Sequence, residues 1–80
     1  MLHYVVELFF DETEQNSIKG IISARTEKDV DKYYDWNLEE VIPETLFETI
    51  DHITMYKINP KEVTRLRREG VLFDVVAEKW

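Results

Sequence analysis

His52 and Thr54 are the two residues whose types and spacing could do chemistry in this 80-residue chain. They lie two apart in residues 50–58, a segment rich in β-branched and aromatic side chains that Asn59 and Pro60 terminate, which predicts a buried strand. Because side chains alternate between the two faces of a strand, His52 and Thr54 should project from the same side. A histidine beside a hydroxyl can hold a phosphate or transfer a proton.

Basic residues follow this predicted strand closely. From Lys57 to Arg68 five basic side chains, Arg65 among them, accompany the single acid Glu62. We expect Lys57, Arg65 and Arg68 to bind one anionic ligand near His52. The alternative is a solvated surface in which the arginines pair with acids on their own helix, a weak contribution of ~0.3–0.5 kcal/mol per pair.

The rest of the charge is strongly negative. The net charge is −7, and nine of the acids fall between Glu27 and Asp51, where only two lysines accompany them. This excess opposes binding to a long nucleic-acid duplex, which requires many neutralised phosphates. The same segment carries an aromatic cluster that could stack on bases, but the neighbouring acids favour core packing or contact with a protein partner. The predicted partner-binding residues are Tyr33, Tyr34, Trp36, Glu39 and Glu40.

Length and composition indicate one folded domain spanning residues 1–80. The apolar content of 44% and aromatic content of 12% are typical of a globular protein. The chain has no cysteine, so disulfides and thiolate metal sites are excluded. It has no apolar run of ~20 residues and no signal-peptide pattern at its start, so we expect a cytoplasmic protein.

Two strands are predicted at the ends of the chain. Residues 2–10 predict the first strand, which has one wholly apolar face. Glu7 lies among apolar neighbours on the other face and should be partly exposed or paired with a cation. Residues 71–77 alternate loosely and predict the last strand. We expect Trp80, the final residue, to pack on another surface.

The region after the first strand has two interpretations. Asp11 or Thr13 could cap a helix running to about Ser23, with Ile18, Ile21 and Ile22 as its apolar stripe. Gly20 would cost that helix about 1 kcal/mol. The other interpretation is a strand over residues 17–25 that forms a hairpin with the first strand. The apolar spacing favours the helix.

Two further helices carry clear capping signals. Thr26 should cap one that ends near Trp36, with residues 38–42 adding one more turn before Pro43. A second spans residues 60–69, with Asn59 as its N-cap and Gly70 just beyond its end. The predicted fold is therefore an α+β domain: a small antiparallel sheet of three or four strands with two or three helices packed on one face.

The order of these segments resembles a known family. Residues 4–10 are predicted to form a strand and residues 11–15 to open a helix, and Asp51-His52-Ile53-Thr54-Met55-Tyr56 follows roughly forty residues later. This arrangement is similar to the N-terminal half of the two-histidine (2H) phosphoesterase superfamily, which includes LigT-like RNA cyclic phosphodiesterases and RNA-repair-type domains. The resemblance implies that His52 acts as general acid or base on a 2′,3′-cyclic phosphate, that Thr54 hydrogen-bonds a phosphate oxygen, and that no metal is used.

The chain departs from that family in having only one His-x-Thr motif. The other histidine, His3, is followed by Tyr4 and Val5. A homodimer could bring together two copies of His52 and Thr54, or the chain could have kept the half-fold and lost catalysis. We therefore expect a small acidic binding protein of the phage or mobile-element regulator type that binds a host protein. The alternative is a phosphodiesterase, or a cyclic-nucleotide or RNA-end binder, completed by homodimerisation. Neither needs a cofactor, a metal or a membrane.

Overall fold

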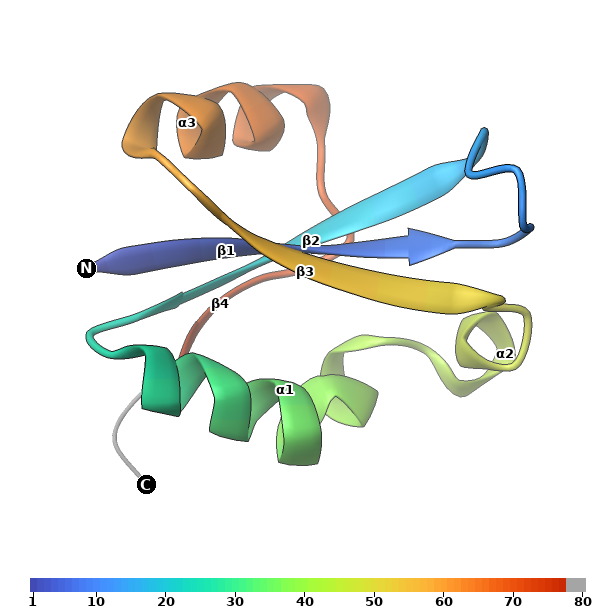
Figure 1. Cartoon of the computed structure of the whole chain (residues 1–80), viewed down its shortest axis with the longest axis horizontal. Helices are drawn as coiled ribbons and strands as arrows, with labels where there is room; N and C mark the ends of the chain where they lie inside the picture. The colour runs from blue at the N-terminus through green and yellow to red at the C-terminus, as the bar shows by residue number, and fades with distance from the viewer. Residues whose placement is uncertain (78–80) are drawn as a thin grey trace.

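Four strands form one sheet, with a helical layer on either side (Figure 1). The computed structural model describes residues 1–77. The strand order is β3-β1-β2-β4, in which β1 is antiparallel to β2 and β3 while β4 is parallel to β2. The elements in chain order are β1 (Leu2–Phe9), β2 (Ser17–Ala24), α1 (Glu27–Val41), α2 (Glu44–Phe47), β3 (His52–Ile58), α3 (Pro60–Glu69) and β4 (Asp74–Ala77).

The predicted α+β class is confirmed, but the helices do not share one face of the sheet. Helix α1 packs in a core with Val6 and Ile22, whereas α3 packs in a second core with Val5 and Ile21. All four of these side chains are fully buried. Neighbouring strand residues point to opposite faces, so the two central strands are apolar on both faces and each face needs a cover.

Residues 17–24 form strand β2, so the favoured prediction of a helix from Asp11 to Ser23 is wrong and the hairpin interpretation is right. The apolar positions that fit a helical stripe also fit a strand buried on both faces. Pairing of β2 with β1 decides between the two, since propensity is easily overridden by tertiary contacts. Gly20 has a packing role here: a Cβ atom at this position would collide with the ring of Phe73.

The capping predictions for α1 and α3 are confirmed. The Asn59 side chain accepts a hydrogen bond from the Glu62 backbone N–H at 2.9 Å, and Gly70 follows α3 with φ of 103°. Thr26 caps α1 by accepting from the Asp29 N–H at 3.2 Å. These local interactions satisfy backbone groups that each helix terminus leaves unpaired.

The helix and strand ends differ modestly from the predictions. Helix α1 continues without a break through Val41, and the short helix α2 follows Pro43. Strand β4 starts only at Asp74, because residues 70–73 form the connection that carries Phe73 into the core. The expected packing of Trp80 lies outside the described residues.

Candidate functional site

His52 and Thr54 project from the same face of β3, as predicted. In the β1–β3 register His52 lies opposite Phe9, and Thr54 lies opposite Glu7. Helix α3 covers the other end of this face, where its apolar residues pack around Val5. The end that carries His52 is consequently not part of that apolar core and consists largely of polar side chains.

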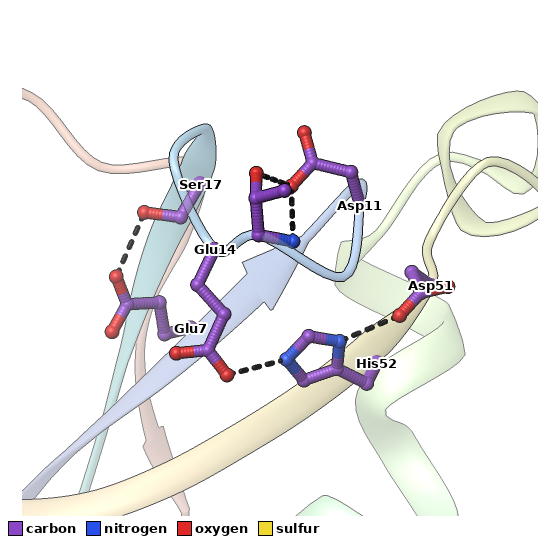
Figure 2. A network of polar contacts seen from close by, with 7 residues as sticks. Glu7, Asp11, Glu14, Ser17, Asp51 and His52 are labelled. Atoms are coloured by element: carbon purple, nitrogen blue, oxygen red, sulfur yellow. Dashed lines mark hydrogen bonds and ion pairs between the residues drawn. The ribbon is translucent and has the colours of Figure 1, made fainter.

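Two carboxylates hold the His52 ring (Figure 2). Its Nδ1 lies 2.8 Å from Asp51 Oδ2, and its Nε2 lies 2.9 Å from Glu14 Oε1. The ring stacks on Phe9 with 4.7 Å between the ring centroids. Hydrogen bonds to Asp51 and then to Glu14 raise the pKa of His52, because both favour the protonated ring.

This geometry fits a structural contact better than a phosphate site. We call the contact, in which Asp51 and Glu14 hold the His52 ring, the His52 clasp. A protonated imidazole has two N–H donors, and each is directed at a carboxylate here. A phosphate would have to displace one of them and would be repelled by the other. Glu14, which supplies one of the carboxylates, stands in the β1–β2 turn with a positive φ of 58°. The clasp therefore ties that turn to the start of β3.

A second polar cluster surrounds Glu7 next to Thr54. Ser17 Oγ donates to Glu7 Oε2 at 2.7 Å, and the Tyr56 hydroxyl donates to Oε1 at 3.3 Å. Lys19 Nζ lies 4.0 Å from the same carboxylate, which provides the cation expected from the sequence. This neighbouring carboxylate also disfavours an anion at Thr54.

The structure does not gather the predicted anion-binding residues around His52. Lys57 lies opposite Tyr4 and, three residues after Thr54, projects from the other face of β3. Arg65 and Arg68 lie on α3 and are exposed. A third arginine of α3, Arg67, donates from its guanidinium to Asp74 in β4.

The second histidine is too far away to complete an acid–base pair within one chain. His3 lies on the same face of the sheet, but it is opposite Ile58 whereas His52 is opposite Phe9. Six residues along a strand span about 20 Å. His3 instead makes a hydrogen bond of 2.7 Å with the buried Ser23 hydroxyl.

The residues predicted to bind a partner separate into two groups. Tyr33 is only 7% exposed and packs in the α1 core, so it cannot contact a partner directly. Trp36 is 82% exposed, which is unusual for a side chain of this size. Glu39 and Glu40 are exposed on the same helix. Tyr33 is buried because it lies three residues after the buried Val30 and so falls on the side of α1 that faces the sheet.

Trp36 borders a groove that joins three elements. A hollow of about 430 Å³ lies between α1, Phe47 of α2 and Ile53 of β3, and it is also lined by Tyr34 and Glu39. An adjoining hollow of about 450 Å³ shares Phe47 and Glu39 and extends to two further acids of the α2 region. We call this joined feature the Trp36 groove. Its lining residues are Tyr34, Asp35, Trp36, Leu38, Glu39, Ile42, Glu44, Phe47, Glu48 and Ile53.

Sequence reasoning missed Glu14 as a partner of His52 and Phe47 and Ile53 as parts of the groove. Glu14 is 38 residues from His52, so no local pattern links them. The aromatic cluster of Tyr33, Tyr34 and Trp36 among acids was the signal in the sequence that pointed to this region. The groove thus combines apolar walls with a negative rim.

Comparisons with protein-family models, curated proteins and solved structures gave no match for this chain. Within residues 1–77 no group of three or more His, Cys, Asp or Glu side chains is arranged to hold a metal ion. No helix in that part of the chain is long and apolar enough to cross a membrane.

Proposed function

We propose that this protein is a small binding module that recognises a basic protein partner through the Trp36 groove. The observation that carries the proposal is the 82% exposure of Trp36 beside a groove with an acidic rim. Large aromatic residues are the most frequent energetic anchors of protein interfaces. Leaving an indole in water has no benefit for folding, so its position is best explained by a contact with another molecule.

The chemistry of the groove selects a cationic partner. Asp35, Glu39, Glu44 and Glu48 lie along it, and the first two flank the indole on α1. An arginine or lysine can stack on the indole face and approach these carboxylates at the same time, a contact worth about 0.5–2 kcal/mol. The apolar floor formed by Phe47 and Ile53 can receive an adjacent aliphatic or aromatic side chain.

The His52 region gives less support to the alternative function, nucleotide or phosphate binding, than the Trp36 groove gives to binding of a basic partner. Both ring nitrogens of His52 are directed at carboxylates. Lys57 projects from the other face of the sheet, and Arg65 and Arg68 lie on α3, which covers the other end of the His52 face. A nucleotide would meet net negative charge there.

A peptide titration tests the proposal. The probe is a synthetic peptide that alternates arginine and leucine, with a glutamate-and-leucine peptide of the same length as its control. We expect the arginine peptide to bind the wild-type chain, with an affinity that falls as salt is added. Trp36→Ala and the pair Asp35→Lys with Glu39→Lys, both of which line the groove, should each weaken binding by at least tenfold, about 1.4 kcal/mol.

A matched charge control separates the groove from general acidity. Glu12→Lys with Glu69→Lys makes the same change in net charge at exposed positions outside the groove. If this control weakens binding as much as the groove variants do, or if Trp36→Ala has no effect, the groove is not the binding site. Equal binding of the glutamate peptide would equally reject a basic partner.

A further inference from the structure

Strand β3 ends the sheet on one side and leaves a seven-residue edge. It pairs with β1 along its whole length, from His52 to Ile58, and no described strand pairs with its other side. The opposite edge strand, β4, has only four residues. A long edge with unpaired backbone groups is a template for another strand, and proteins usually protect it. Strand β3 has no proline, and its basic residues are Lys57 and His52, whose ring nitrogens are directed at Asp51 and Glu14.

The side chains along β3 complement a second, antiparallel copy of the same strand. With Thr54 at the two-fold axis, Ile53 lies opposite Met55 of the other copy and His52 lies opposite Tyr56. The same register places Asp51, just before the strand, opposite Lys57, so that opposite charges meet at both ends. Moving the axis to Met55 would oppose Ile53 to Lys57 and lose this match.

From this self-complementary register we infer that two copies of the chain pair through β3 about an axis at Thr54, forming a continuous eight-stranded sheet. An isologous contact of this kind uses the same surface on both copies and closes on itself. It also removes the exposed edge, because each β3 becomes an interior strand. The acid at one end and the lysine at the other select the antiparallel arrangement over the parallel one.

Two consequences follow for the sites described above. The axis is perpendicular to the sheet, so both α1 layers lie on the same face of the dimer. If the proposed function holds, two Trp36 grooves then face the same side, and a partner with two basic segments gains affinity through avidity. The two His52 residues, by contrast, are four residues apart along the strand direction, about 13 Å, which is too far to serve one phosphate.

The absence of cysteine from the sequence makes a cross-linking experiment simple. Directly opposed residues of an antiparallel pair have Cα atoms about 4.5–5.5 Å apart, which falls within the disulfide range. Thr54→Cys in the full chain should therefore form a disulfide-linked dimer rapidly with oxidised glutathione. Tyr56→Cys on the same strand and Thr64→Cys on exposed α3 are the controls, and both should stay mostly monomeric.

Light scattering gives an independent measurement that needs no cross-link. The wild-type chain should show twice the 9.6 kDa mass of one copy. Lys57→Asp should shift the mass to that of one copy, because the new acid would lie opposite Asp51 of the other copy. The charge swap Asp51→Lys with Lys57→Asp should restore the dimer. Circular dichroism checks that each variant is folded.

The outcomes are separable. A wild-type chain that scatters as a monomer, together with equal oxidation rates at the three cysteine positions, overturns the inference. Faster oxidation of Tyr56→Cys than of Thr54→Cys would reject this register in favour of another. Because none of these measurements uses a basic peptide, their failure leaves the Trp36 groove untouched, and a failed peptide titration leaves the dimer untouched.

Discussion

Gly20→Ala should destabilise the protein even though the same change usually stabilises a strand. Gly20 does not have a positive φ, so the backbone accepts alanine, and a smaller entropy of the unfolded chain would normally contribute about 0.4–1 kcal/mol. The new methyl group, however, would overlap the ring of Phe73, which is 7% exposed and packed in the α1 core. The ring therefore has to move within a filled space.

Overpacking of this kind costs about 1–3 kcal/mol. After subtraction of the entropic gain, the net loss should be roughly 1–2 kcal/mol in the free energy of unfolding. For a domain of this size that loss lowers Tm by about 5–15 °C. Thermal melts followed by circular dichroism, together with urea titrations, measure both quantities.

A double-mutant cycle identifies the ring as the cause. In the Phe73→Leu background the alanine at position 20 should cost at least ~0.5 kcal/mol less than in the wild-type chain, because the shorter side chain leaves room for it. Gly70→Ala is the matched control: it is strained by its φ of 103° and has open space around it, so its cost should not depend on Phe73. A rise in Tm for Gly20→Ala, or an equal cost in both backgrounds, would refute this account of the packing.

Three further predictions test the His52 clasp, α1 and the α3 cap. Because the pKa of His52 is raised, the clasp stabilises the fold fully below the ordinary pKa of 6.5 and loses this effect as the pH rises through the folded-state pKa. The difference in urea midpoint between wild type and His52→Gln should therefore shrink from acid to alkaline buffers. A difference that stays constant with pH would contradict this prediction. Tyr33→Ala should cost about 3 kcal/mol or more, whereas Trp36→Ala should change stability by no more than ~0.5 kcal/mol, and comparable losses would mean that Trp36 is part of the core. Asn59→Ala should cost about 1 kcal/mol by removing the α3 cap, and an unchanged unfolding midpoint would indicate that water replaces that bond.

Local chemistry determined the parts of this fold that depend on neighbouring residues. Asn59, Pro60, Glu62 and Gly70 specify α3 within a dozen positions, because a cap, a fixed φ and a helix stop all act on adjacent backbone groups. The alternation along β3 likewise sufficed to place His52 and Thr54 on one face. These predictions needed no knowledge of the rest of the chain.

Tertiary structure decided what local patterns leave open. The isoleucines of β2 satisfy a helical and an extended pattern equally, and only pairing with β1 and the fit of Gly20 against Phe73 select the strand. The β1–β2 hairpin brings Glu14, which is 38 residues away in sequence, to one ring nitrogen of His52. From the sequence alone, that nitrogen was expected to meet a phosphate. The exposure of Trp36 was decided in the same way, because the sheet buries one stripe of α1 and leaves the opposite side to water. Residue types set what each side chain can do, and the packing of distant segments sets which of those roles its surroundings allow.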